Sequence, residues 1–161
     1  MIRIGIVTAS DKGSRGERED LSAGVIREMV EELGEVVAYR MVPDERQILS
    51  DTMRTMIDSE EVDLVLTTGG TGFSPRDVTP EATMDIVERP VPGIPEAMRA
   101  ASLAITNRAM LTRSVAGIRG SSLIINLPGS PKACRECLEV VLPVLKHGLD
   151  ILKGLDGECA R

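Results

Sequence analysis

Two aspartates and a glycine-rich segment are the residues of this chain whose types and spacing suggest chemistry. The segment Gly69, Gly70, Thr71 and Gly72 directly follows the apolar, β-branched run VDLVLTT. Residues without a Cβ atom let backbone amides approach a phosphate closely and adopt positive φ angles. Neither the Walker A pattern nor the dinucleotide-binding fingerprint is present. The segment is therefore a candidate phosphate cradle, and an ordinary tight turn is an equally open alternative.

Asp44 and Asp77 each follow a predicted strand and precede a predicted helix. Taken alone, each has a simpler interpretation: Asp77 as a helix-start carboxylate that favours the dipole, and Asp44 as a cap with Gln47 at capping-box spacing. Two carboxylates that follow strands of one parallel sheet converge at one edge if the strands are neighbours. Such a pair is suited to holding a magnesium ion that bridges a triphosphate.

The remaining reactive side chains give weaker signals. Arg76 either neutralises a phosphate or is simply solvated, and the second outcome is the commoner one for a surface arginine. Cys134 and Cys137 form a CxxC pair inside a predicted helix without a second pair, which favours helix-face thiols over a zinc or redox site. The single histidine, His147, lies far in sequence from the glycine segment, so covalent nucleophilic catalysis has little support.

Alternating strands and helices must position these residues. Apolar periodicity predicts strands at residues 3–8, 36–42, 62–68, 115–119 and 123–127, and helices at 21–33, 48–57, 81–88, 96–106 and 131–152. This alternation indicates right-handed crossovers and a mainly parallel α/β sheet, with the site formed by loops at the carboxyl ends of the strands. The polar segment 9–20 is predicted to be a long loop, and we expect it to act as a lid over the site.

Three local signals predict where helices begin, end or bend. Gly34 stands where a helix C-cap is expected. Thr79 and Pro80 occupy the cap and first-turn positions of a short helix. Pro143 lies inside the last apolar-periodic segment, which it should kink or split into two helices.

Composition limits the class of protein. With 161 residues and 42% hydrophobic residues, the chain fits one domain, 1–161, built around a single core. A net charge of −6, without a basic stripe or interleaved aromatics, argues against a nucleic acid as partner. Three unframed cysteines, no signal-like N-terminus and no long apolar run predict a reduced, cytoplasmic protein that does not enter a membrane.

The segment TTGGTGFSPRDVTPEAT, residues 67–83, closely resembles the signature of molybdopterin adenylyltransferases. These are the MogA/MoaB-like bacterial proteins and the equivalent domains of gephyrin-like two-domain proteins. The resemblance extends to VPDE at 42–45 and to AMLTRSVAGIRGSSLIINLPGSPKA at 109–133, and it covers nearly the whole chain.

The resemblance implies a three-layer αβα fold, usually a homotrimer, that transfers AMP from ATP to the terminal phosphate of molybdopterin and releases pyrophosphate. It implies magnesium as cofactor and a separate MoeA-like molybdenum-insertion protein as partner. The two functional aspartates of the family carry over to Asp44 and Asp77, either or both of which would hold the metal. Positions that match the family's substrate-binding segments are Gly69, Gly70, Thr71 and Gly72 for phosphate, and Ser102, Pro128, Gly129 and Ser130 for the pterin region. Arg76, and more weakly Lys12 and Arg15, are candidates for anion contacts.

Two other functions compete with this one. A non-catalytic molybdopterin-binding protein of MoaB type would use the same pocket without turning over ATP, but it would not need two metal-competent carboxylates. A CinA-like or nicotinamide-mononucleotide deamidase-like enzyme would share the glycine loop, but it fits the RDVTPEAT and LPGSPKA segments less well. The sequence does not decide whether the protein is a trimer or a hexamer, or whether the eventual metal is supplied as molybdate or tungstate.

Overall fold

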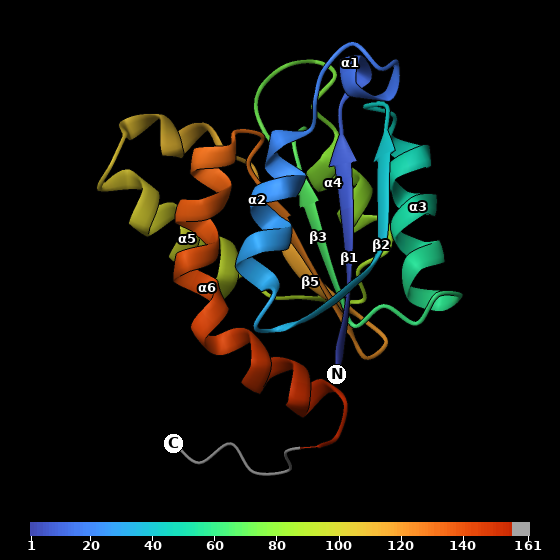
Figure 1. The fold of residues 1–161 in the computed structure, drawn as a ribbon. Helices are drawn as coiled ribbons and strands as arrows, with labels where there is room; N and C mark the ends of the chain where they lie inside the picture. Colours follow the sequence, from blue (N-terminus) through green and yellow to red (C-terminus); the bar gives the residue numbers. More distant parts are fainter. Residues whose placement is uncertain (156–161) are drawn as a thin grey trace.

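A six-stranded, mostly parallel sheet forms the centre of the protein in the computed structural model, which describes residues 1–155 (Figure 1). The predicted domain 1–161 thus ends in residues 156–161 that lie outside the described part. The strands are β1 (Ile2–Ala9), β2 (Gly34–Val42), β3 (Leu64–Thr68), β4 (Arg89–Pro90), β5 (Ala116–Arg119) and β6 (Ser122–Leu127). Their order in the sheet is β2-β1-β3-β6-β5-β4. The first four strands in this order are parallel, whereas β5 runs antiparallel to β6 and β4 antiparallel to β5.

Helices cover both faces of the sheet, so the predicted α/β fold with three layers is confirmed (Figure 1). The helices are α1 (Asp11–Ser14), α2 (Leu21–Val30), α3 (Arg46–Asp58), α4 (Thr79–Met84), α5 (Gly93–Leu103), the 3-10 helix η1 (Asn107–Leu111) and α6 (Pro131–Leu152). One apolar cluster joins α2, α5 and α6 to the sheet, and the other joins α3 and α4 to it.

Strand side chains alternate between the two layers. In β3, Leu64 and Leu66 belong to the cluster under α2 and α6, while Val65 belongs to the cluster under α3. In β6, Leu123 and Ile125 face the first cluster and Ile124 the second. This two-residue period is what a strand buried on both faces requires, and it accounts for the nearly continuous apolar runs in the sequence.

Three expectations about local structure are wrong. Gly34 does not cap α2, which ends at Val30; it begins β2, and a Cβ there would lie 2.2 Å from the carbonyl oxygen of Ile2. Glycine is therefore required by the close approach of the neighbouring strand and not by a helix end. Thr79 is the first residue of α4 and not its cap, and its hydroxyl makes no capping bond. The predicted loop 9–20 contains the short helix α1, whose Gly13 amide donates to the side chain of Ser10.

The later helices differ from expectation mainly in their bounds. The short helix predicted at 81–88 is α4, which begins at residue 79 and ends at 84, and the helix predicted at 96–106 is α5, which begins three residues earlier. Pro143 lies inside α6, which stays one helix and bends along its course (Figure 1). Of the two predicted outcomes, a kink or a split into two helices, the structure shows the first. Within residues 1–155, no helix has the length and apolar character needed to cross a membrane.

Candidate active site at the carboxyl edge of the sheet

The register of the parallel strands brings four loops to the same level. Ala9 pairs with Val42, Thr8 pairs with Thr68, and Thr68 pairs with Leu127, so that β1, β2, β3 and β6 end together. The loops that follow these strands carry all of the predicted functional residues except Ser102. Because β1 lies between β2 and β3, Asp44 and Asp77 follow strands that are one strand apart and not direct neighbours.

A cavity of about 560 Å³ opens among these loops. Six of the predicted residues line it: Asp44, Gly69, Gly70, Asp77, Gly129 and Ser130. The charged side chains of its lining are Arg18, Glu19, Asp20, Asp44 and Asp77. Four carboxylates against one guanidinium make the cavity acidic, so a phosphorylated ligand needs positive charge from elsewhere to enter it.

Asp44 is fixed by a reciprocal pair of hydrogen bonds with Asp11. The backbone N–H of Asp11 donates to Asp44 Oδ2, and the backbone N–H of Asp44 donates to Asp11 Oδ1, both at 3.0 Å. Burial, together with the negative charges of Asp11 and Asp77, raises the pKa of the Asp44 carboxyl above its ordinary value, although the Asp11 amide works in the opposite direction. Asp44 does not cap α3, whose N-cap is Glu45. The carboxylate, held through Oδ2 and not engaged by the helix, therefore lines the cavity.

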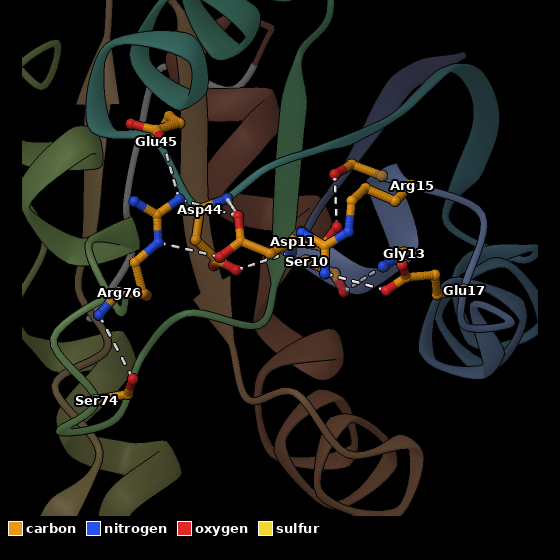
Figure 2. Close-up of polar contacts among 10 residues, drawn as sticks. Ser10, Asp11, Gly13, Arg15, Glu17, Asp44, Glu45, Ser74 and Arg76 are labelled. Carbon is orange, nitrogen blue, oxygen red and sulfur yellow. Dashed lines mark hydrogen bonds and ion pairs between the residues drawn. The ribbon is translucent and has the colours of Figure 1, made fainter.

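Arg76 ties three loops together (Figure 2) and does not line the cavity. Its guanidinium donates to both carboxylate oxygens of Asp11 at 3.0 Å and to Glu45 at 2.9 Å. This pairing holds the pKa of the Asp11 carboxyl below its ordinary value. Arg76 thus links the loop after β3 to those after β1 and β2, which makes it a structural element of the site and leaves its predicted anion contact without support.

The glycine loop has the backbone that the sequence suggested. Gly69 and Gly70 have φ angles of +91° and +69°, in the left-handed region that favours glycine. A Cβ on Gly70 would lie 2.3 Å from Thr79 Oγ1 and 3.2 Å from Asp44 Oδ1. Thr71 and Gly72 do not line the cavity; Thr71 is buried, and its carbonyl accepts from the Arg113 amide at 2.8 Å. Only the first half of the predicted cradle therefore faces a ligand.

Arg113 braces the loop that carries Asp77, and sequence reasoning missed it. Its guanidinium donates to the carbonyls of Gly72 at 2.8 Å and Asp77 at 2.7 Å, and to both carboxylate oxygens of Glu81. The Asp77 carboxylate accepts from the Ser74 amide at 3.1 Å. Nothing in the local pattern distinguishes Arg113 from a surface arginine, because its partners are more than thirty positions away in the chain.

The predicted pterin region is divided between two cavities. Gly129 and Ser130 line the large cavity, whereas Ser102 and Pro128 line a smaller one of about 200 Å³ between α5, η1 and α6. Ser130 also caps α6, since its hydroxyl accepts from the Ala133 amide. The structure thus brings Ser130 to the glycine loop and keeps Ser102 apart from it.

Several cavity residues lie in the segment expected to be a lid. Ser10, Gly13 and Arg18 line the cavity, whereas Arg15 pairs with Glu17 on the surface. The predicted loop 9–20 therefore does contribute to the site, but through Arg18 and not through Arg15. Arg18 differs from the other basic residues of this segment only in its position in the folded backbone, so nothing in the sequence indicated that it would line the cavity.

Asp20, which also lines the cavity, anchors the start of α2. Its carboxylate accepts from the Ala23 amide at 3.0 Å, from the Thr8 hydroxyl at 2.6 Å and from the Tyr39 hydroxyl. Burial and the neighbouring Asp20 raise the pKa of Tyr39 to about 12. The anchor fixes the part of the cavity wall that lies at the start of α2.

The CxxC pair plays no visible part in this site. Cys134 and Cys137 are buried in α6, as expected of helix-face thiols. Burial raises the pKa of Cys134 to about 11, so the thiolate that metal binding or redox exchange needs is disfavoured.

Comparison with known proteins agrees with the fold and the motifs. A family model described as a probable molybdopterin binding domain matches residues 5–147. The molybdopterin adenylyltransferase of Helicobacter pylori (strain J99) is 46% identical over 156 residues, which cover 95% of this chain and 89% of that protein. The corresponding enzyme of Escherichia coli (strain K12) is 40% identical over 155 residues, covering 92% and 80%.

A solved structure gives the same answer for the fold. The molybdopterin biosynthesis enzyme MoaB from Thermus thermophilus superposes with a TM-score of 0.89 and 53% sequence identity, covering 96% of this chain and 98% of that one. Similarity of this extent, in sequence and in structure, is sufficient to assign the chain to a family. The chain belongs to the molybdopterin-binding domain family of molybdenum cofactor biosynthesis.

Proposed function

We propose that this protein is a molybdopterin adenylyltransferase, which transfers AMP from ATP to the terminal phosphate of molybdopterin and releases pyrophosphate. The observation that carries the proposal is the convergence of Asp44, Asp77 and the Gly69–Gly70 turn on one cavity at the carboxyl edge of the sheet. Relatives that are 40% and 46% identical over nearly the whole chain bear the name of this enzyme. The proposed domain is the entire chain, 1–161.

The chemistry asks little of protein side chains. An oxygen of the terminal phosphate of molybdopterin, ionised at neutral pH, attacks the α-phosphorus of ATP. The new O–P bond forms as the bond from the α-phosphorus to its bridging oxygen breaks, and pyrophosphate leaves with that electron pair. No protein nucleophile is needed, so the protein contributes positioning and stabilisation of charge.

The residues of the cavity are suited to positioning the substrates and stabilising charge. The glycine turn, at positive φ, leaves room for a phosphate close to the backbone of Gly69 and Gly70. Arg18, the one basic residue of the lining, lies between α1 and α2. The Asp11 amide holds one carboxylate oxygen of Asp44, and Arg113 holds the backbone of the loop that carries Asp77.

Magnesium fits the same donor set. Within residues 1–155 no group of three or more His, Cys, Asp or Glu side chains could hold a metal by itself. Mg²⁺, however, is commonly bound by one or two carboxylates together with substrate phosphates and water, which matches Asp44 and Asp77 facing an acidic cavity. When bound, Mg²⁺ would supply the positive charge that offsets repulsion between the two reacting phosphates.

The test is a pyrophosphate-release assay with purified protein, ATP, magnesium and molybdopterin, run beside Asp77→Asn. Release that depends on molybdopterin and is lost in the variant would support adenylyl transfer at this site. A folded wild-type protein that binds molybdopterin but releases no pyrophosphate would instead support the non-catalytic, MoaB-like alternative.

The proposal includes an assembly and a partner. Four exposed apolar side chains on or beside α5 and η1 offer a surface for a homotrimer: Leu103, Ile105, Met110 and Leu111. The adenylylated product would pass to a separate MoeA-like molybdenum-insertion protein in the cytoplasm. Sedimentation equilibrium should give three times the 17.3 kDa chain mass; a monomer at micromolar concentration would contradict the trimer.

A further inference from the structure

The hydroxyl of Thr79 is a buried polar group without a partner. Thr79 is fully buried, and within residues 1–155 its Oγ1 is the only buried side-chain oxygen or nitrogen of the protein that makes no hydrogen bond. A threonine at a helix start usually caps the helix, but this hydroxyl makes no capping bond to α4. Burying an unsatisfied hydroxyl opposes folding, so its presence calls for an explanation other than stability.

Thr79 Oγ1 lies beneath the glycine turn, next to the Asp44 carboxylate. The backbone N–H of Thr79 donates to the Gly70 carbonyl at 3.1 Å, which fixes Thr79 to the turn. A Cβ on Gly70 would meet Thr79 Oγ1 at 2.3 Å and Asp44 Oδ1 at 3.2 Å, so the two oxygens flank the same small space. Glycine at position 70 keeps that space open.

The Asp44 oxygen on this side also lacks a donor. Asp44 Oδ2 accepts from the Asp11 amide, whereas Oδ1 accepts no hydrogen bond from any residue in the described part of the chain. One carboxylate oxygen is therefore held and the other is not. The Thr79 hydroxyl, which borders the same space, is an uncommitted donor with which the second oxygen can pair.

We propose that Thr79 is a positioning residue for Asp44: when ATP and magnesium occupy the glycine turn, the Thr79 hydroxyl donates to Asp44 Oδ1 and fixes the carboxylate toward the ligand. The role rests on the proposed function, since it assumes that Asp44 acts on magnesium-bound ATP. The structure shows no hydrogen bond between Thr79 Oγ1 and Asp44 Oδ1, so the proposed role requires ligand binding to bring the two oxygens within hydrogen-bonding distance.

Two substitutions separate the hydroxyl from the shape of the side chain. Thr79→Val keeps the shape and removes the hydroxyl, and Thr79→Ser keeps the hydroxyl. Thr79→Val should be at least as stable as the wild type in thermal unfolding, because no existing bond is lost. It should nevertheless need about tenfold more magnesium for half-maximal ATP binding, the loss expected when a charged group loses one hydrogen bond, while Thr79→Ser stays close to the wild type.

Thr83, one turn later in α4, is the matched control. It is also fully buried, but its hydroxyl donates to the Thr79 carbonyl at 2.8 Å and accepts from the side-chain amide of Asn126 at 2.9 Å. Thr83→Val should therefore lower the thermal stability and leave the magnesium requirement unchanged. The two valine variants are expected to show opposite patterns, which a purely structural role of Thr79 would not produce.

The measurement is a calorimetric titration of ATP at a series of magnesium concentrations, with Thr79→Ala as a second hydroxyl-free variant if Thr79→Val does not fold. An unchanged magnesium requirement in the hydroxyl-free variants, or an equal defect in Thr79→Ser, would overturn the role of the hydroxyl. Wild-type protein that binds no ATP at any magnesium concentration would overturn the proposed function and this role with it.

Discussion

Asp44 experiences opposing influences that together set its charge. The Asp11 amide stabilises the carboxylate, whereas burial and the nearby charges of Asp11 and Asp77 oppose ionisation, and the balance raises its pKa above the ordinary 3.8. A cation beside a carboxyl group favours its ionised form, and this stabilisation matters most where the surroundings oppose ionisation. The environment of Asp44 is therefore compatible with the magnesium-bound phosphate that we propose for this site.

This balance predicts an acid limit for ligand binding. Only the ionised form of Asp44 binds a cation, and its raised pKa means that protonation begins at a higher pH than for an ordinary aspartate. Magnesium-dependent ATP binding should thus weaken as the pH falls, with a midpoint above 3.8. Calorimetry across pH checks this, and Asp44→Asn should bind weakly without that midpoint. A midpoint at or below 3.8 in the wild type would contradict the assignment.

Gly70 allows a comparison between a required and a dispensable glycine. Gly70→Ala places a methyl group 2.3 Å from Thr79 Oγ1 at a φ angle of +69°, and it should destabilise the protein by about 2 kcal/mol and weaken ATP binding. Gly148→Ala, inside α6 with open space around it, should stabilise by about 0.5–1 kcal/mol. Urea denaturation measures both effects, and equal effects at the two sites would show that the turn is not constrained.

The sequence allowed the site to be predicted to the extent that its residues are local. Gly69–Gly70 and Asp44 come directly or almost directly after strands, Asp77 lies further along the loop after β3, and the structure brings all of them to one cavity. Arg76 was expected to contact an anion but is tied to Asp11, a partner 65 positions away. Arg113 was not predicted for a similar reason, because the residues around it in the sequence do not indicate which distant residues its side chain contacts.

At the scale of the elements, Arg113 connects the start of β5 to the loop between β3 and α4. One guanidinium satisfies two loop carbonyls and the Glu81 carboxylate. The loop carries Asp77 and also makes hydrogen bonds of its own, such as that from the Asp77 N–H to the Ser74 carbonyl, so this arginine adds to the contacts that hold its shape.

Replacing Arg113 should consequently affect stability and ligand binding together. Arg113→Gln removes the ion pair with Glu81 and should cost about 1–3 kcal/mol of unfolding free energy and weaken ATP binding. Arg54→Gln, which breaks an exposed pair with Asp51, should change stability by less than about 0.5 kcal/mol. Chemical denaturation compares the two, and an Arg113 variant as stable as the Arg54 variant would argue against a brace.

Element type was more predictable than element ends. Each apolar-periodic run forms the strand or helix expected. A helix buries one stripe of side chains and a central strand buries both of its faces, so the spacing of apolar residues indicates which of the two forms. Gly34 shows why ends are harder to predict. A glycine after a helix usually marks its C-cap, yet this one is required by the Ile2 carbonyl of the adjacent strand, a contact that only the assembled sheet creates.

At the scale of the whole molecule, the Tyr39–Asp20 pair connects β2 to the start of α2 and so links the sheet to one wall of the cavity. Burial, with Asp20 beside it, raises the pKa of Tyr39 to about 12. In the unfolded chain the same phenol ionises near its ordinary value of about 10. The stabilisation from a neutral Tyr39 is thus fully present below about pH 10 and is lost as the pH rises toward about 12.

The chain is well suited to measuring this, since Tyr39 is its single tyrosine and it has no tryptophan. Tyrosinate absorbance should rise with a midpoint near about pH 12 in the folded protein and near about pH 10 in denaturant. Asp20→Asn should lower the folded midpoint by removing the neighbouring charge. A folded wild-type midpoint near about 10 would mean that the hydroxyl is not held as described.

The central claim is that this cavity joins AMP to a phosphate of molybdopterin. The most direct measurement supplies ATP labelled at the α-phosphate, with magnesium and molybdopterin, and follows the label by chromatography. Label should enter the molybdopterin product with wild-type protein, and should not with Asp44→Asn or Asp77→Asn. Label that stays in ATP, or appears only as free AMP, would contradict adenylyl transfer.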